Sequence, residues 1–466
     1  MLRSCLASMI AAAWMLTASA AAWDPAVGSF EHAGSDRTGL FAAASPFAAS
    51  VGEPAGRKVA ELPGVWSTAL DSQGRVFVLG GVIADSPDLT PFVSRHDPGQ
   101  QREVWRARLP LPGGAEYWNY PGGIGVHRNG FVYVAYATRL AKLDPVSGDV
   151  LASVDLPAPN GVADTTYNGF IVLSDGTLVT KSHHRKPDCA VQGFRAFIVC
   201  GVEGLPPSAV VMVDPVDLKI RWSGQAEELI GGRITATRFR GREYVYLAGV
   251  DKLHRMRVAG RRLVKDTRWG PVAYREGRET GGTAAVGFGD WVVIQSNALP
   301  TPAPMRLVAV SQADAARRHD IHPFRENPVA GWSFMPSKAS TDWEARRVYT
   351  SDAYGGFAAL DFDPERGFSI AWRSGQYTGS FITLLGDRAS RVVVATDIGA
   401  ARPDAYGSPR YPSEQLVWRR ADDGSEIGRV RDLPRNFGLT LVPTERGAVY
   451  YATGANGLWY VTPPGR

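Results

Sequence analysis

The chain has 466 residues, of which 44% are hydrophobic, and a formal net charge of +5. Its basic residues stand singly or in pairs, so the clustered cations that a nucleic-acid-binding surface needs are missing. Thirteen tryptophans, 51 glycines and 32 prolines suit many short strands joined by tight turns, and they argue against a helical bundle.

The first twenty residues have the pattern of a secretory signal peptide. Arg3 supplies a positive charge, residues 5–16 are almost continuously apolar, and residues 18–20 are small, as signal peptidase requires. The apolar run is shorter than the roughly 20 residues that span a bilayer, so no membrane span is expected. We predict cleavage after Ala20 or Ala22 and a periplasmic or secreted protein, with an N-terminal extension over residues 21–56.

A repeated phrase runs along the rest of the chain: an apolar strand, a turn containing glycine, and a second strand rich in valine and aromatic residues. Clear copies occupy residues 66–79, 123–134 and 169–180. Looser copies start near Ile234, Ala284, Ser337, Ile382 and Leu439. A unit that recurs about every 45 to 65 residues is typical of a repeat architecture whose units bury their faces against one another.

A second phrase follows several of these copies: a strand ending in aspartate, a short turn, and a strand that often carries tryptophan. It occurs at residues 143–148, at Asp214-Pro215 before Trp222, at Asp363-Pro364 before Trp372, and at Trp418 before residues 422–424. Together the two phrases predict four antiparallel strands per repeat, which is the blade of a β-propeller. We therefore predict an all-β fold, a single propeller over residues 57–466, with eight blades, or seven if two loose copies are one.

The ends of the chain indicate how the ring closes. The last copy, residues 438–463, has room for about three strands in a four-stranded blade. The segment from Arg57 to Leu62 precedes the first copy and has no partner of its own. We predict that it supplies the missing outer strand, which also removes two exposed sheet edges.

Cys189 and Cys200 are the two cysteines beyond the signal peptide. In an oxidising compartment such a pair closes a disulfide, and the alternative is two buried thiols. The bond would contribute about 3 kcal/mol by the chain-entropy relation. Little helix is expected. Residues 312–318 are the one short candidate, and residues 225–229 are too few to stand alone.

The Asp-Pro and Asp-Asp-Gly turns beside tryptophan-bearing strands resemble the blades of the quinoprotein alcohol dehydrogenase-like (PQQ-like) propeller superfamily, over most of residues 61–463. The resemblance implies either a pyrroloquinoline-quinone dehydrogenase or a non-catalytic scaffold of the bacterial outer-membrane assembly type. The quinone enzymes commonly carry a disulfide between adjacent cysteines over the cofactor, and Cys189 and Cys200 are not adjacent. The cofactor is left open, with pyrroloquinoline quinone or a divalent cation as candidates.

Propeller ligands usually sit at the mouth of the central channel, on the face formed by loops that leave the second strand and loops that enter the innermost one. Loops of the first kind contain Lys181, His183, His184, Arg185, Gln295, Asn297, Asp352 and Asp397. Loops of the second kind contain Trp118, Asn119, Tyr120, Tyr167, Asn168, Arg233, Tyr377, Thr378, Arg435 and Asn436. Because equivalent positions of different blades converge on one axis, we predict a polar, aromatic site of mixed charge.

The adjacent histidines are the sharpest element of this set. Imidazole titrates near neutrality, so His183 or His184 is predicted to donate or accept a proton, with Lys181 and Arg185 holding an anionic group. Successive residues of an extended chain point to opposite faces, so one of the two histidines is expected to face the axis. The alternative is a solvated loop beside the disulfide.

The other candidates each have a structural alternative. Asp352 and Asp397 are either paired carboxylates for acid–base work or cation binding, or turn-forming aspartates. The aromatic residues Trp118, Tyr120 and Tyr167, with Asn119 and Asn168, either contact a planar or sugar-like ligand or pack between blades. His319 and His322 would share a helical face as metal ligands only if the short helix before them ran on.

Two functions remain open. The first is an enzyme that acts on a small polar or aromatic substrate, with Arg185 and Arg233 clamping an anion. The superfamily implies an oxidoreductase, and a lyase or hydrolase without cofactor is compatible with the same residues. The second is a binding scaffold for another exported protein. The convergent charged residues favour the enzyme.

Overall fold

The computed structural model describes residues 22–48, 52–82, 90–97, 102–112, 117–277, 279–298, 304–326, 338–352, 355–399, 413–435, 440–453 and 457–465. The predicted signal peptide and Asn436 lie outside these residues. In this described part of the chain, no helix is long and apolar enough to cross a membrane.

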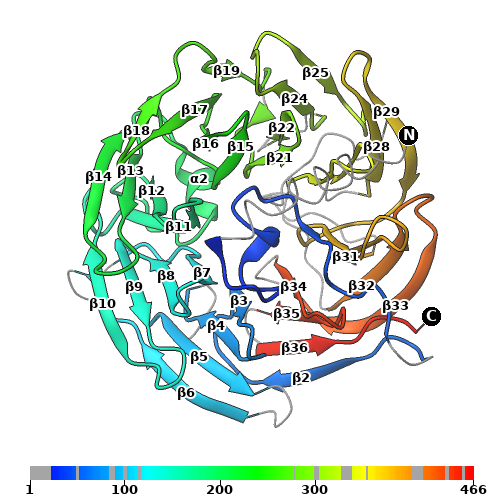
Figure 1. Cartoon of the computed structure of the whole chain (residues 1–466), viewed down its shortest axis with the longest axis horizontal. Helices are drawn as coiled ribbons and strands as arrows, with labels where there is room; N and C mark the ends of the chain where they lie inside the picture. Colours follow the sequence, from blue (N-terminus) through cyan, green and yellow to red (C-terminus); the bar gives the residue numbers. More distant parts are fainter. Residues whose placement is uncertain are drawn as a thin grey trace, which may run out of the picture.

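Eight antiparallel blades, each built on four strands, form a closed ring around one axis (Figure 1). This confirms the eight-bladed prediction, and all eight copies of the first sequence phrase coincide with the two innermost strands of a blade. Blades 1 to 4 consist of β3 (Ser67–Leu70), β4 (Val76–Gly80), β5 (Phe92–Asp97) and β6 (Arg102–Arg108); β7 (Gly123–Val126), β8 (Val132–Tyr136), β9 (Arg139–Leu143) and β10 (Val150–Asp155); β11 (Thr165–Val172), β12 (Leu178–His184), β13 (Ala209–Val213) and β14 (Ile220–Gln225); β15 (Ile234–Phe239), β16 (Arg242–Ala248), β17 (Lys252–Ala259) and β18 (Arg262–Lys265).

Blades 5 to 8 repeat the pattern, with the last one completed by a strand from the other end of the chain. They consist of β21 (Ala285–Phe288), β22 (Trp291–Gln295), β24 (Leu307–Ser311) and β25 (Arg318–Ile321); β26 (Ser340–Asp342), β27 (Arg347–Ser351), β28 (Phe357–Asp363) and β29 (Gly367–Ser374); β30 (Thr383–Leu385), β31 (Val392–Asp397), β32 (Ser413–Arg420) and β33 (Glu426–Pro434); β34 (Leu441–Pro443), β35 (Val449–Thr453), β36 (Gly457–Val461) and β2 (Gly56–Ala60). Four short strands of the described residues lie outside this pattern: β1 (Leu40–Phe41) pairs with β30, β19 (Val272–Ala273) pairs with β17, and β20 (Glu279–Thr280) pairs with β23 (Asn297–Ala298).

The ring closes as the sequence predicts. Strand β2 runs antiparallel to β36, with Lys58 opposite Trp459. The two strands lie side by side at the rim in Figure 1. A four-stranded last blade therefore needs residues from both ends of the chain.

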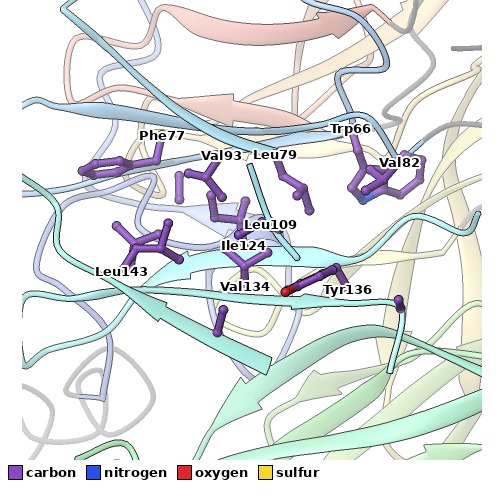
Figure 2. Packing of buried hydrophobic residues seen from close by; sticks show 14 of the residues in the cluster. Trp66, Phe77, Leu79, Val82, Val93, Leu109, Ile124, Val134, Tyr136 and Leu143 are labelled. Atoms are coloured by element: carbon purple, nitrogen blue, oxygen red, sulfur yellow. The ribbon is translucent and has the colours of Figure 1, made fainter. Parts of the chain in front are cut away.

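The core lies between neighbouring blades. Phe77 and Leu79 of blade 1 pack against Ile124 and Val134 of blade 2 (Figure 2). All four are fully buried, and burying a side chain of this kind contributes roughly 1.5–3 kcal/mol. Inner strands such as β3 and β7 are buried along their whole length, whereas the outermost strand β6 alternates between exposed and half-buried residues.

The helix predicted over residues 312–318 is wrong. The segment is a turn followed by β25, because Asp314 Oδ1 accepts the amide of Ala316 and Gln312 Oε1 accepts the hydroxyl of Thr237. His319 therefore lies on a strand, with Nε2 3.0 Å from the Pro364 carbonyl oxygen. Two helical segments that the sequence did not predict are η2 (Glu31–Ala33) and α2 (Arg195–Cys200).

The N-terminal segment after the predicted signal peptide fills the central channel. In Figure 1 it is the dark blue ribbon inside the ring. Its carbonyl groups accept one inner-strand amide after another as the segment turns around the axis. The donors are the amides of Leu70, Val126, Ala236, Gly287, Thr341 and Leu384, and the acceptors, in the same order, are the carbonyls of Gly28, Ser29, Ser35, Asp36, Thr38 and Gly39. Strand β1 (Leu40–Phe41) then pairs in parallel with β30.

The extension is thus part of the fold. Ala22 and Trp23 are already buried, and the carbonyl of Ala22 accepts the amide of Arg128 at 3.2 Å. Trp23 stacks on Phe30 with their ring centroids 3.9 Å apart. The segment satisfies strand edges that would otherwise face the channel with unpaired polar groups.

We expect Gly28→Ala to destabilise the protein. A Cβ at this position would lie 2.7 Å from the carbonyl oxygen of Pro443 and 2.9 Å from a methyl carbon of Leu70. The clash should lower the free energy of unfolding by about 1–3 kcal/mol, measured by denaturant titration. Gly375→Ala is the matched control, because a Cβ at Gly375 meets nothing within 4 Å. Equal unfolding midpoints for the two variants would contradict the tight docking of the segment.

Candidate functional site

Lys181 and His183 form a buried pair on β12, the second strand of blade 3. Lys181 Nζ lies 2.8 Å from His183 Nδ1. Both atoms also lie 2.9 Å from the carbonyl oxygen of Ile230. Lys181 and His183 are almost completely inaccessible to solvent. The sequence placed them in a loop, whereas they continue the strand, because Thr166 and Val210 extend the ladder on either side.

Aromatic rings enclose the His183 imidazole. Trp118 stacks nearly parallel to it at 5.8 Å, and Tyr120 and Phe197 approach edge-on at 5.0 and 4.6 Å between centroids. His183 Nε2 is buried and has no hydrogen-bond partner among the described residues. A ring nitrogen in an apolar enclosure is therefore available to a ligand.

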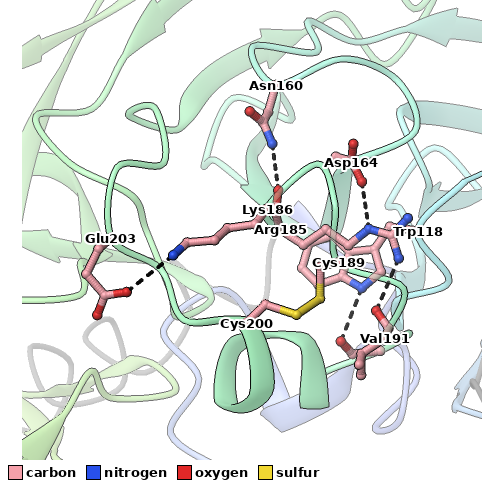
Figure 3. The surroundings of a disulfide bond; sticks show 10 residues. Trp118, Asn160, Asp164, Arg185, Lys186, Cys189, Val191, Cys200 and Glu203 are labelled. Atoms are coloured by element: carbon pink, nitrogen blue, oxygen red, sulfur yellow. Dashed lines mark hydrogen bonds and ion pairs between the residues drawn. A yellow bond between two sulfur atoms is a disulfide. The ribbon is translucent and has the colours of Figure 1, made fainter.

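The disulfide loop packs beside Trp118, one of the residues of this enclosure (Figure 3). Cys189 and Cys200 are bonded, with their Cα atoms 6.0 Å apart, which confirms the predicted disulfide. The loop between them includes α2, which carries Phe197. Two hydrogen bonds join this loop to Trp118 and Asn119. Trp118 Nε1 donates to the Gly193 carbonyl at 3.1 Å, and Gln192 Oε1 accepts the Asn119 amide at 2.8 Å.

Burial governs the ionisation of this pair. Desolvation, followed by the charges of Arg233 and Arg37, lowers the pKa of Lys181 well below its ordinary value. Desolvation and the nearby Lys181 lower the pKa of His183. His183 is consequently a neutral imidazole at neutral pH, and Lys181 loses its proton far more readily than an exposed lysine.

An ion cluster lies on the axis beside the pair. Glu31 Oε1, on the channel-filling segment, accepts from Arg37 at 3.0 Å and from Arg233, which enters blade 4. All three side chains are buried. Lys338, which enters blade 6, donates to the Arg37 carbonyl at 3.0 Å, and desolvation is the main cause that lowers its pKa to about 7.

Several predicted site residues form hydrogen bonds and ion pairs with other residues of the protein. Arg185 pairs with Asp164 at 2.7 Å and donates to the Val191 carbonyl (Figure 3). Asp397 accepts from Arg429 at 2.9 Å and from the amides of Tyr377 and Gly399.

Three further predicted residues are also bonded to other parts of the protein. Asp352 Oδ1 accepts the Gly356 amide at 2.8 Å, and Gln295 bridges to Thr350 and the Ser351 carbonyl. Tyr167 packs in the core and donates to the Pro157 carbonyl.

Asn168 reaches the enclosure through a hydrogen bond to Tyr120. His184 contacts Thr165 and Ser182, so the two histidines have separate surroundings. The backbone of Asn297 pairs with Thr280 in β20, and Arg435 follows β33.

Sequence analysis missed Glu31, Arg37, Lys338 and Phe197. The first two belong to a segment that was treated as an extension. Its content of aromatic residues, with Trp23, Phe30 and Phe41 within twenty residues, was a signal that it packs in a core.

No protein-family model and no curated protein matches this sequence. Solved structures do match in fold. A quinohemoprotein alcohol dehydrogenase from Comamonas testosteroni has 11% identity and a TM-score of 0.57, over 94% of this chain and 81% of its own. One from Pseudomonas putida HK5 has 12% identity and a TM-score of 0.56, over 95% and 81%. BamB from Moraxella catarrhalis has 11% identity and a TM-score of 0.49, over 89% and 100%.

This chain has the same eight-bladed propeller fold as the two alcohol dehydrogenases. The resemblance drawn from the tryptophan-bearing strands is confirmed at the level of architecture, and identities this low carry no activity over.

The site residues of this propeller do not fit a quinone. The channel axis is filled by residues 28–39, which are bonded to the inner strands. The disulfide joins cysteines eleven positions apart and lies beside Trp118. Among the described residues, no group of three or more histidine, cysteine or acidic side chains is placed to hold a divalent cation.

We expect the stability of the protein to fall with pH partly through His184. Burial, followed by the charge of Lys181, lowers its pKa from 6.5 to about 4. Between these values the unfolded chain binds a proton that the folded chain does not, so stability is present above pH 6.5 and is lost towards pH 4. His184→Gln should reduce the slope of unfolding free energy against pH by up to about 1.4 kcal/mol per unit. Parallel pH profiles for the variant and the wild type would refute this assignment.

We expect the double variant Cys189→Ser, Cys200→Ser to lose about 3 kcal/mol of unfolding free energy, because the bond closes a short loop. Reductant should lower the denaturation midpoint of the wild type and leave that of the variant unchanged. A wild type insensitive to complete reduction would mean that the hydrogen bonds to Trp118 and Asn119 hold the loop alone.

Proposed function

We propose that this protein is an exported enzyme that binds a small polar or aromatic carboxylate at the end of the central channel and transfers a proton through His183. The observation that carries the proposal is the buried Lys181–His183 pair, whose Nε2 has no partner among the described residues and lies inside a ring of aromatic side chains. An assembly scaffold has no need for a desolvated lysine beside an imidazole whose Nε2 has no partner among the described residues.

The protonation state of Lys181 sets the role of His183 Nε2. A charged Lys181 donates to both the Ile230 carbonyl and Nδ1, so the ring carries its hydrogen on Nε2, which then is a donor. With Lys181 neutral, Nδ1–H donates to the Ile230 carbonyl and Nε2 accepts. One proton on the pair therefore switches the same nitrogen between general base and general acid.

The charges around the pair favour an anionic substrate. Lys181 is close enough to Arg233 and Arg37 for their charges to lower its pKa. A carboxylate bound here would offset this repulsion and raise the pKa of the amine. Phe197 covers the His183 ring from α2, so we expect substrate entry to displace Phe197.

Proton abstraction and return are the chemistry of a lyase or hydrolase, and these residues supply both without a cofactor. The oxidoreductase class implied by the superfamily remains a prediction, since the axis of the channel does not fit a quinone. Export is supported by the signal-like residues 1–20 and by the Cys189–Cys200 disulfide, which is typical of oxidising compartments.

The proposal predicts selective stabilisation by acids. Small aromatic and aliphatic carboxylates, each paired with its neutral amide, would be screened by thermal unfolding of the mature protein. We expect acids to raise the midpoint more than their amides, through preferential binding to the folded state. Lys181→Met should abolish the difference.

Lys142→Met is the matched control. Lys142 is also a buried lysine bonded to a backbone carbonyl, that of Val216 at 3.0 Å, but it lies in the outer part of blade 2. This variant should retain the preference for acids. For any acid that is turned over, His183→Gln should keep binding and lower kcat by about 10²–10⁴-fold. Equal stabilisation by acids and amides, or full turnover in His183→Gln, would remove the proposal.

A further inference from the structure

Three buried polar atoms next to the channel-filling segment have no partner among the described residues. They are Glu31 Oε2, His32 Nε2 and Trp66 Nε1. Glu31 is completely buried, and His32 and Trp66 are less than a tenth exposed. Unsatisfied buried groups of this kind cost about 1–3 kcal/mol each, more when charged, so a cluster of them calls for a ligand.

The three atoms belong to one contiguous group. Glu31 Oε2 lies 4.0 Å from His32 Nε2, which is too far for a hydrogen bond and close enough for one ligand atom to contact both. Glu31 Oε1 is bound by Arg233, whose guanidinium lies 5.8 Å from the centre of the Trp66 ring. The Phe381 ring meets His32 edge-on at 4.6 Å.

Charge at this group is unbalanced. Three basic side chains, those of Arg37, Arg233 and Lys338, face two carboxyl groups, those of Glu31 and Asp36. Burial raises the pKa of Asp36 to about 6 and lowers that of Lys338 to about 7, so both side chains keep part of their charge at neutral pH and the group stays net positive. Unpaired buried charge is costly, and an added anion would reduce the cost.

We propose that Glu31, His32, Trp66 and Arg233 form a subsite for a hydroxylated carboxylic acid, such as a sugar acid. The inference rests on the proposed function, whose substrate class it specifies, and it makes the N-terminal segment part of the binding site.

Each functional group of the ligand matches one feature of the subsite. A ligand hydroxyl donates to Glu31 Oε2, which is an acceptor only. Trp66 Nε1 donates to a ligand oxygen. The ligand carboxylate supplies the negative charge that the cations lack, and the Trp66 and Phe381 rings cover apolar C–H faces.

Calorimetric titration of the mature protein with three probes tests this assignment. Glucuronate has both a carboxylate and hydroxyls, glucose lacks the carboxylate, and cyclohexanecarboxylate lacks the hydroxyls. We expect glucuronate to bind at least about tenfold more tightly than either of the others, as a hydrogen bond to a charged group predicts.

Two substitutions locate the effect. Glu31→Gln keeps an oxygen for Arg37 and Arg233 but replaces Oε2 by an NH₂ group. The lost charge affects both acids alike, so the variant should weaken glucuronate binding at least about tenfold relative to cyclohexanecarboxylate binding. Trp66→Phe keeps the ring and removes the N–H. Trp105→Phe is its control, because Trp105 Nε1 is also buried without a partner among the described residues but lies on the outermost strand of blade 1.

The outcomes separate the two proposals. Equal affinities for the two acids, both lost in Lys181→Met, would overturn the subsite and leave the proposed function standing. Unchanged glucuronate binding in both Glu31→Gln and Trp66→Phe would also overturn the subsite. If neither acid binds, both the subsite and the proposed function are overturned.

Discussion

The hydrogen bonding between the N-terminal segment and the innermost strands is the constraint on which the rest of the structure depends. In a ring of blades, each innermost strand presents an edge of unpaired backbone groups to the channel. Here the carbonyls of residues 28–39 accept amides from blade after blade. Further along the same end of the chain, residues 56–60 form β2 at the rim of blade 8. One short stretch of sequence thus secures the ring at its centre and at its circumference.

The docking of this segment also affects the ionisation of the side chains around the axis. Docking the segment takes Glu31 and Arg37 out of water and sets them against Arg233 of blade 4. With solvent excluded, these charges act on Lys181 over distances at which water would screen them. The lowered pKa of Lys181 and the neutral imidazole of His183 are therefore consequences of how the channel is filled.

The eight blades could be predicted because their signal is local and repeated. Each inner pair of strands is a short apolar run broken by a glycine turn, and the phrase at residues 123–134 falls on β7 and β8. The aromatic residues of the N-terminal segment indicate that it packs in a core, but its place in the channel could not be predicted, since backbone carbonyls make its bonds to the inner strands.

The candidate site shows the same division. His183 was found from the adjacent histidines and the expected convergence of blades. Whether Asp397 serves a ligand or a turn depends on Arg429, 32 positions away, whose guanidinium is 2.9 Å from it. Residues 312–318 were predicted as a short helix, but Asp314 Oδ1 accepts the Ala316 amide within a turn, and Gln312 Oε1 accepts the hydroxyl of Thr237 on β15, which is distant in the sequence.

Arg233 connects the two halves of the proposed site. It fixes Glu31 Oε1, which leaves Oε2 as an acceptor for a ligand, and its charge helps to keep Lys181 and His183 neutral. An anion bound near Arg233 would weaken that second effect and raise the proton affinity of Lys181. Substrate binding would then protonate the lysine, move the hydrogen of His183 to Nε2 and ready it as an acid. In such a site, the charge of the bound carboxylate would itself activate the imidazole, because it changes the protonation of Lys181.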